Sequence, residues 1–124
     1  MPELPEVETT LRAIKKFQGQ NLINIKVHNR NLRWTVSKDL EKNSKNQKLI
    51  DLHRRAKYII FELENTYLLL HLGMSGSLRI LKSEDNYFLK HDHIEFIFDN
   101  EKIIYNDPRR FGSLHMTKDI NNHK

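Results

Sequence analysis

Short strand-forming stretches, each bounded by turn residues, fill most of the chain after residue 48, and this pattern most restricts the possible folds. Because helical periodicity is confined to the first 43 residues, no helices alternate with these strands, which argues against a βαβ fold. We expect an α+β, mainly β fold: an antiparallel two-sheet β-sandwich of about seven or eight strands with an N-terminal helix and a short second helix. The predicted strands are 23–27, 49–53, 58–63, 67–72, 77–81, 91–98, 102–105 and 113–116.

Two helices are predicted before the strands. The first spans residues 5–18, with Pro5 suited to its first position and Gly19 following as a stop. Ser37 is expected to cap the second helix, which runs to about residue 42. One face of the first helix carries apolar residues at helical spacing, namely Val7, Leu11, Ile14 and Phe17.

The 124 residues correspond to a single domain, expected to be a monomer. The chain contains no cysteine, which excludes disulfides and cysteine-ligated zinc within it and fits a cytoplasmic protein. No apolar run approaches the roughly 20 residues of a membrane helix, and we expect no membrane association. Glu3, Glu6 and Glu8 occupy the region that a signal peptide would keep positive or apolar.

Basic residues are concentrated in the first part of the predicted sheet region. Residues 31–62 carry eight Lys/Arg against four Asp/Glu, whereas residues 63–100 carry three against six. Such asymmetry suggests that one face meets a polyanion, although a solvated charged surface would show the same pattern. Trp34, in the basic segment, is expected to pack against a strand end.

The N-terminal residues Pro2 and Glu3 form a possible catalytic pair once Met1 is removed. The amine of Pro2 would then be secondary, and an α-amino group is partly unprotonated near neutral pH. Condensation of a secondary amine with a sugar aldehyde carbon gives a cationic iminium, the electron sink of Schiff-base catalysis. The alternative is an ordinary proline-containing lead-in to a helix.

Two clusters of basic residues contain the side chains that commonly bind phosphate groups. Arg54, Arg55 and Lys57 stand at one strand boundary, where they could grip a phosphate backbone or merely protect a strand edge. In the turn at residues 107–112, Pro and Gly bracket Arg109, Arg110 and Phe111. Adjacent cation and aromatic side chains suit stacking on bases, unless the ring of Phe111 folds inward.

The loop at residues 72–76 places Met74 between two glycines. Glycines allow a tight bend and close approach to a partner, and two interpretations of Met74 remain open: an apolar wedge between bases or a core plug. Farther along, His91, His93 and Glu95 alternate and would share one strand face. No further ligand is evident to complete a metal site with these three residues, so we favour a phosphate contact or hydrogen bond over a metal site.

Four motifs together resemble one family, the bacterial formamidopyrimidine-DNA glycosylases. They occur in the same order as in that family, and the resemblance extends from residue 1 to at least Thr117. The motifs are MPELPEVET at 1–9, RRAKY at 54–58, HLGMSG at 71–76 and DPRRFG at 107–112. The resemblance implies excision of oxidised purines, such as 8-oxoguanine and formamidopyrimidines, from damaged double-stranded DNA, followed by β- and δ-elimination at the abasic site.

The resemblance also implies residue roles. Pro2 would be the nucleophile, Glu3 the proton donor to the opening sugar, and Lys57 a phosphate contact and proton donor in elimination. His91 would bind DNA. The remaining DNA-binding residues implied by these motifs are Met74, Arg109 and Phe111, which would fill the gap left by a flipped nucleotide, together with Arg110, His71 and Arg54.

The chain also departs from the family. Members continue with a helix–two-turn–helix segment and usually a cysteine-ligated zinc finger, whereas this sequence stops at Lys124. We therefore expect no cofactor in this chain and interpret residues 1–124 as a single N-terminal catalytic domain, either excised or naturally truncated. Weak duplex binding and little glycosylase activity are expected of it alone, because phosphate contacts supply most non-specific affinity. The alternative function is a non-catalytic DNA-binding module.

Overall fold

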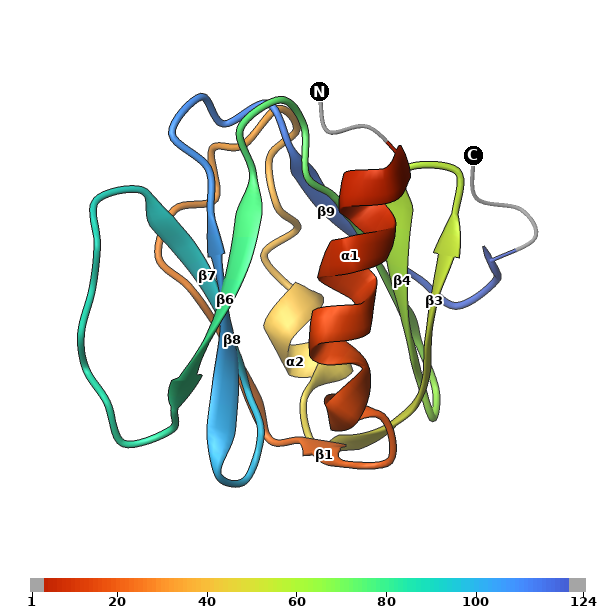
Figure 1. Ribbon diagram of the computed structural model, residues 1–124. Helices are drawn as coiled ribbons and strands as arrows, with labels where there is room; N and C mark the ends of the chain where they lie inside the picture. Colours follow the sequence, from red (N-terminus) through yellow and green to blue (C-terminus); the bar gives the residue numbers. More distant parts are fainter. Residues whose placement is uncertain (1–3, 121–124) are drawn as a thin grey trace.

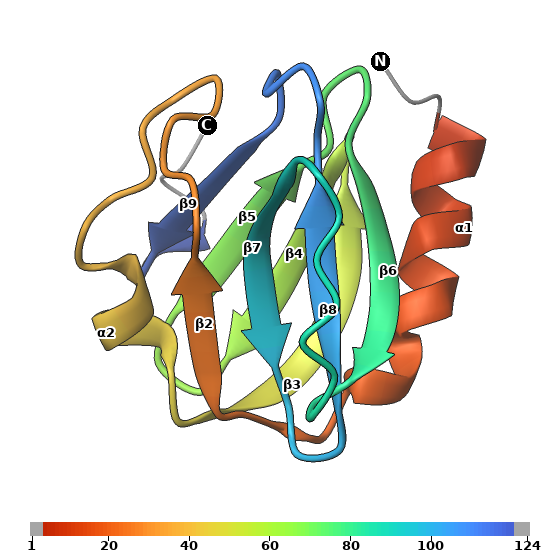
Figure 2. The ribbon, with the colours of Figure 1, turned by 90° about the vertical axis from the view of Figure 1, so that its left-hand side faces the viewer.

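The computed structural model describes residues 4–120, which form two antiparallel sheets packed face to face (Figures 1 and 2). One sheet has the strand order β1-β3-β4-β5-β9 and the other the order β2-β7-β8-β6. The strand bounds are β1 (Asn21–Leu22), β2 (Asn24–Val27), β3 (Gln47–Arg55), β4 (Tyr58–Leu63), β5 (Tyr67–His71), β6 (Ser77–Lys82), β7 (Asp92–Ile97), β8 (Glu101–Asn106) and β9 (Ser113–Thr117).

The core lies between the sheets, where inward-facing residues of both meet. Phe61 of β4 stacks on Phe96 of β7, with ring centroids 5.1 Å apart and an interplanar angle of 16°. Phe17 packs against Phe98 with centroids 4.6 Å apart. All four rings are fully buried, and truncating a buried Phe to Ala typically costs about 3–5 kcal/mol. The Phe61–Phe96 pair joins the two sheets, and the Phe17–Phe98 pair joins the 3-10 turn Lys15–Phe17 to the residue that follows β7.

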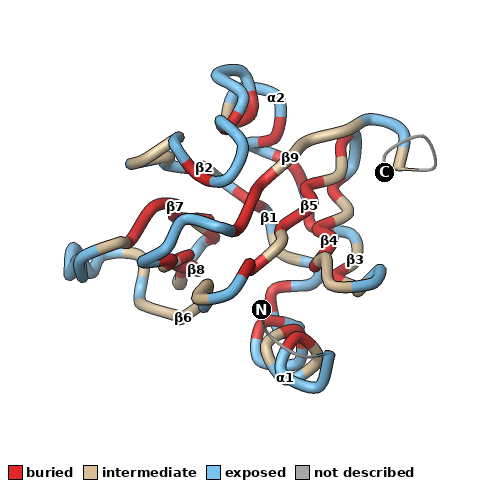
Figure 3. Tube along the Cα trace, turned by 90° about the horizontal axis from the view of Figure 1, so that it is seen from above, coloured by how far each residue is buried: buried red, intermediate tan, exposed pale blue. Residues whose placement is uncertain are grey.

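Two helices close the open sides of the sandwich (Figure 3). Helix α1 (Leu4–Ile14), continued by a 3-10 turn (Lys15–Phe17), packs against β3 of one sheet and edge strand β6 of the other. Helix α2 (Leu40–Ser44) contacts β2 and β9 on the opposite side. The helices thereby cover edge strands, which otherwise invite pairing with other chains.

The predicted fold class is confirmed, with differences in detail. Residues 4–120 form nine strands, where seven or eight were predicted. The additional strand is β1, whose two residues are too few to show an alternating pattern. The apolar face of the first helix is buried, and Gly19 follows it with φ +92°. Helix α2 begins at Leu40 after Asp39 without a side-chain cap, so the predicted cap at Ser37 is wrong.

Several connections gather at one end of the sandwich, at the top of Figure 1. They are the β3–β4 turn, the β5–β6 loop and the β8–β9 loop, beside the start of α1. The β3–β4 turn is a hairpin, whereas the β5–β6 and β8–β9 loops each cross from one sheet to the other. Within the described range, no helix is long and apolar enough to cross a membrane.

Candidate nucleic-acid interface

The β5–β6 loop and the β8–β9 loop pack backbone to backbone at this end. Gly73 has φ +71°, and a Cβ there would lie 2.5 Å from the amide nitrogen of Gly112. A Cβ on Gly112 would overlap the Tyr105 hydroxyl and approach the His71 carbonyl oxygen to 2.5 Å. Glycine is therefore required at both positions, because a side chain at either would push the loops apart.

The close contact places three predicted DNA-contacting side chains on one exposed tip. Met74 is 51% exposed and Phe111 is 39% exposed, so neither is a core plug or an inward-folded ring. The guanidinium carbon of exposed Arg109 lies 4.8 Å from the centre of the Phe111 ring. We call Met74, Arg109 and Phe111 the wedge. It combines apolar surface with a positive charge, which suits contact with bases and phosphates together.

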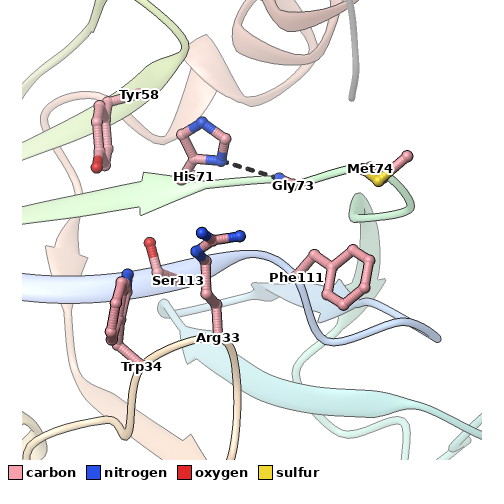
Figure 4. Close-up of a pocket in the computed structure, with 8 residues that line it drawn as sticks. All are labelled: Arg33, Trp34, Tyr58, His71, Gly73, Met74, Phe111 and Ser113. Carbon is pink, nitrogen blue, oxygen red and sulfur yellow. Dashed lines mark hydrogen bonds between the residues drawn. The ribbon is translucent and has the colours of Figure 1, made fainter.

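A cavity of about 420 Å³ opens beside the wedge (Figure 4). Two of its walls come from residues that the sequence patterns did not mark as functional: Arg33 and Trp34, in the loop after β2. Trp34 is 57% exposed, so its predicted packing against a strand end is wrong. The Arg33 guanidinium carbon lies 5.6 Å from the Trp34 ring centre. The adjacent arginine and tryptophan in the sequence are a pattern from which this part of the site could have been predicted. The full lining is Arg33, Trp34, Tyr58, His71, Gly73, Met74, Phe111 and Ser113.

His71 lines this cavity from the end of β5 as a neutral hydrogen-bond donor. The Gly73 amide donates to its Nδ1 over 3.1 Å, which leaves the ring hydrogen on Nε2 (Figure 4). Burial lowers the pKa of His71, and the nearby charges of Lys57 and Arg33 lower it further. A neutral imidazole with an Nε2 hydrogen can donate to a phosphate oxygen without relying on its own charge.

Arg54 ties the β3–β4 turn to helix α1. Its Nε lies 2.5 Å from the Glu8 carboxylate, and its Nη1 donates to the Ala56 carbonyl over 2.8 Å. Ala56 has φ +53°, so the turn that carries Lys57 is tightly bent. The structure therefore places Arg54 in an internal ion pair, while its assignment to DNA binding stays a prediction. Lys57 is partly buried in this turn.

His91 lies immediately before β7 and has φ +72°. His93 is 4% exposed and bonds the Asp107 carbonyl oxygen through Nε2 at 2.7 Å. Glu95 is also buried, where it pairs with Lys102 at 2.8 Å. A register shift between Asp92 and Ile94 interrupts the expected alternation, so the three residues do not form a metal site. Instead, His91 stays partly exposed and His93 makes the hydrogen bond favoured from the sequence.

One group of metal-ligating side chains does occur among residues 4–120, on the outer face of the β3–β4 hairpin. Asp51, His53 and Glu62 bring their ligand atoms within 4.8 Å of one another. However, His53 already bonds the Asp51 carboxylate at 3.0 Å, and the Lys15 ammonium lies 4.0 Å from Asp51. The internal bond and the neighbouring cation weaken the case for an ion, and we assign none.

The predicted catalytic residues are only partly placed. Pro2 and Glu3 lie outside the described residues. His71, Met74 and Phe111 line the cavity at the loop end (Figure 4). Arg109 lies against Phe111, Lys57 is in the β3–β4 turn, and Arg110 is exposed with φ +55°. The structure thus brings the predicted phosphate and base contacts of distant motifs to one end of the sandwich.

Comparison with known proteins agrees with this arrangement. Residues 1–114 match the formamidopyrimidine-DNA glycosylase N-terminal domain. Formamidopyrimidine-DNA glycosylases of Yersinia pseudotuberculosis and Haemophilus influenzae are 47% and 48% identical over 122 residues, covering 97% of this chain. The chain spans only 45% and 44% of the length of those relatives.

Solved structures show the same fold. Lactococcus lactis formamidopyrimidine-DNA glycosylase, non-covalently bound to DNA containing an AP site, aligns with a TM-score of 0.85 and 34% identity. That alignment covers 94% of this chain and 45% of the other. A mutant of the L. lactis enzyme in complex with Fapy-dG-containing DNA aligns with a TM-score of 0.84 and 35% identity, covering 94% of this chain and 43% of the other.

Proposed function

The chain belongs to the formamidopyrimidine-DNA glycosylase family, and on this premise we propose that it is the catalytic domain of a base-excision repair enzyme. Its substrate is damaged double-stranded DNA, and the bases removed are oxidised purines such as 8-oxoguanine and formamidopyrimidines. The reaction couples a glycosylase step with lyase cleavage at the abasic site. The domain acts as a monomer on chromosomal DNA in the bacterial cytoplasm.

The proposed chemistry begins at the N-terminal amine. The Pro2 nitrogen attacks the anomeric carbon, and the electron pair of the glycosidic bond leaves with the base. Glu3 protonates the opening sugar, which gives a cationic iminium between Pro2 and the sugar carbon. This cation withdraws electrons, so loss of a proton from C2′ expels the 3′ phosphate, and loss of a second proton, from C4′, then expels the 5′ phosphate. Lys57 contacts phosphate and donates a proton during elimination, and hydrolysis of the iminium restores Pro2.

The position of the wedge is the observation that best supports this function. Exposed Met74, Arg109 and Phe111 stand together at the end of the sandwich where α1 begins and where Lys57 lies in the β3–β4 turn. Extrusion of a nucleotide costs a few kcal/mol of unpairing and unstacking. Side chains that occupy the vacated space offset this cost, and they must be exposed to do so. Here the geometry meets that requirement.

The extent of the chain bears on its activity. It spans about 45% of the length of its curated relatives. We propose that residues 1–124 supply the chemistry and one wall of a DNA cleft, while the other wall, including a structural zinc site, belongs to the remaining length of such relatives. No cofactor is proposed for residues 1–124.

Borohydride trapping tests the nucleophile directly. The 124-residue chain with a free Pro2 amine is incubated with abasic-site duplex DNA and sodium borohydride, which reduces an iminium to a stable amine. We expect a covalent adduct that disappears when Met1 is retained or another residue precedes Pro2. A chain that binds DNA but forms no adduct, with binding unchanged by Glu3→Gln, would instead be the non-catalytic module.

A further inference from the structure

A buried carboxylate lies directly beneath the wedge. Asp107 is 0% exposed, and each of its oxygens accepts two hydrogen bonds. Oδ1 accepts from the Ser75 hydroxyl at 2.6 Å and the Arg110 amide at 3.1 Å. Oδ2 accepts from the Tyr105 hydroxyl at 2.6 Å and the Gly112 amide at 2.9 Å. Asp107 therefore joins the β5–β6 loop to the β8–β9 loop.

All four partners are donors in this arrangement, and only an ionised carboxylate can accept from them all. Burial by itself would raise the pKa of Asp107, but these hydrogen bonds, from Ser75 and Tyr105 first, bring it below its ordinary value. The side chain is thus charged at neutral pH. An asparagine side chain at position 107 would replace one acceptor oxygen with an NH₂ group, a donor that would face other donors.

Ser75 provides a second link, from the Met74 loop to the Arg109 backbone. Its Oγ donates to Asp107 and accepts from the Arg109 amide at 3.1 Å. One hydroxyl therefore connects the residue after Met74 with the backbone of Arg109. The Asp107 amide also donates to the His91 carbonyl oxygen at 3.1 Å, which extends the network to a third predicted DNA-contacting segment.

We propose that Ser75 and Asp107 are positioning residues that fix the wedge in its DNA-binding arrangement before DNA arrives. Neither side chain needs to touch DNA for this role. The inference rests on the proposed function, because it assigns a cause to the geometry of the wedge. Pre-organisation raises affinity by removing the entropy cost of ordering side chains on binding, about two- to tenfold for each rotamer-rich side chain.

The decisive readout is discrimination between two duplexes. Contacts to phosphate support binding to any duplex, whereas the wedge adds affinity only where a nucleotide is missing from the stack. A loosened wedge should therefore weaken binding to abasic-site DNA and leave binding to intact DNA unchanged. General loss of structure would weaken both.

The test measures fluorescence anisotropy of labelled abasic-site and intact duplexes at low salt with Ser75→Ala, Ser75→Thr and Ser77→Ala. Ser75→Ala should reduce the ratio of the affinity for abasic-site DNA to the affinity for intact DNA about tenfold. This is the loss expected when one to three wedge side chains are no longer ordered before binding. Ser75→Thr keeps a hydroxyl and should restore much of the ratio. Ser77→Ala is the matched control, since Ser77 is exposed at the start of β6 and takes no part in the network.

A wild-type ratio in Ser75→Ala would overturn the proposal, as would an equal loss for both duplexes. A wild-type chain that binds both duplexes equally would contradict the function proposed for the wedge and, with it, this inference. Amide hydrogen exchange without DNA gives an independent check. Exchange at Arg109 and Arg110 should accelerate in Ser75→Ala and not in Ser77→Ala, and unchanged exchange would also overturn the proposal.

Discussion

At the scale of single residues, the proposed DNA contacts and the contacts that hold the fold involve different side chains. Met74 projects from the loop end with half of its surface exposed, whereas the neighbouring glycines are enclosed by backbone. Substitution of an exposed side chain usually changes stability little, while substitution of a glycine in contact with backbone forces the chain to move. Mutations one to two positions apart should therefore separate the two properties.

Met74→Ala should weaken binding to abasic-site DNA about tenfold, because it removes apolar surface that replaces the flipped nucleotide. Its free energy of unfolding should stay within about 0.5 kcal/mol of wild type, since Met74 is exposed. Anisotropy and urea denaturation measure the two quantities. Unchanged affinity for abasic-site DNA would remove Met74 from the wedge.

Gly112→Ala should lower the free energy of unfolding by about 1–3 kcal/mol, because the new Cβ would overlap the Tyr105 hydroxyl and crowd the His71 carbonyl. It should also reduce discrimination for abasic-site DNA by displacing Phe111. Gly19→Ala is the control: its φ of +92° strains the backbone, but no atom lies within 4 Å of the new Cβ. That variant should lose stability and keep discrimination, and equal discrimination in both variants would contradict the expectation.

At the scale of secondary-structure elements, the start of β7 is held by an internal ion pair. Asp92 accepts two bonds of 2.7 Å from the Arg79 guanidinium on β6, and Asn106 of β8 donates to the same carboxylate at 2.8 Å. These contacts join three strands of one sheet next to His91. Although burial opposes its charge, the hydrogen bonds from Arg79 and Asn106 lower the pKa of Asp92 to about 2.

This shift predicts acid sensitivity. A carboxyl group with a depressed folded pKa stabilises the fold fully above its unfolded pKa, and the contribution is lost as pH falls through the folded pKa. For Asp92 the window runs from about pH 4 down to about pH 2, and the contribution is about 2 kcal/mol. Urea denaturation at pH 5, 3 and 2 should show a smaller decline in Asp92→Asn than in wild type. Asp85→Asn, at an exposed position on the β6–β7 loop, should decline like wild type.

An equally steep decline in wild type and Asp92→Asn would show that the Arg79 pair does not contribute to acid sensitivity. The Asp107 carboxyl has its pKa lowered in the same direction and remains present in Asp92→Asn. Some decline below about pH 4 should therefore persist in that variant.

At the scale of the whole molecule, the net charge of +5 and the clustered loops favour DNA contact at one end of the sandwich. The chain nevertheless spans less than half the length of its relatives. Fewer phosphate contacts mean lower affinity, because each contact releases counterions from DNA. A domain that keeps the wedge but has few phosphate contacts should still prefer abasic-site DNA to intact DNA, although its affinity for both is low.

The 124-residue chain should therefore bind duplex DNA weakly, lose less affinity between 50 mM and 200 mM salt than a protein with many phosphate contacts, and excise little 8-oxoguanine. Arg110→Ala should reduce the slope of log affinity against log salt by about one, as expected for one phosphate contact. Anisotropy titrations and gel-based excision assays measure these properties. Robust excision from duplex DNA by this chain alone would contradict the expectation.

Local patterns were sufficient to predict most of the fold. Apolar residues at helical spacing predicted the buried face of α1, and strand-forming stretches bounded by turn residues predicted β3, β4 and β5. Both patterns are local, so residues near one another in the sequence determine them. Strand β1 was missed because two residues are too few to show a period.

The four family motifs suggested the chemistry and predicted that Met74, Arg109 and Phe111 face DNA, and the structure places these three exposed side chains together at one end of the sandwich. Sequence alone also provided the nucleophile hypothesis at Pro2, which remains a prediction. What motifs cannot specify is the set of contacts between segments distant along the chain. Their residue types are compatible with several partners, and only the packed structure selects one.

Three features of the site were decided by the tertiary structure. It paired Arg54 with Glu8, 46 positions away, and left Trp34 exposed beside a cavity instead of packed against a strand. It also buried Asp107 among donors from two loops. The physical reason is the same in each case: a short-range period determines which face of an element is buried, whereas hydrogen bonds and ion pairs depend on which distant element is packed against that face.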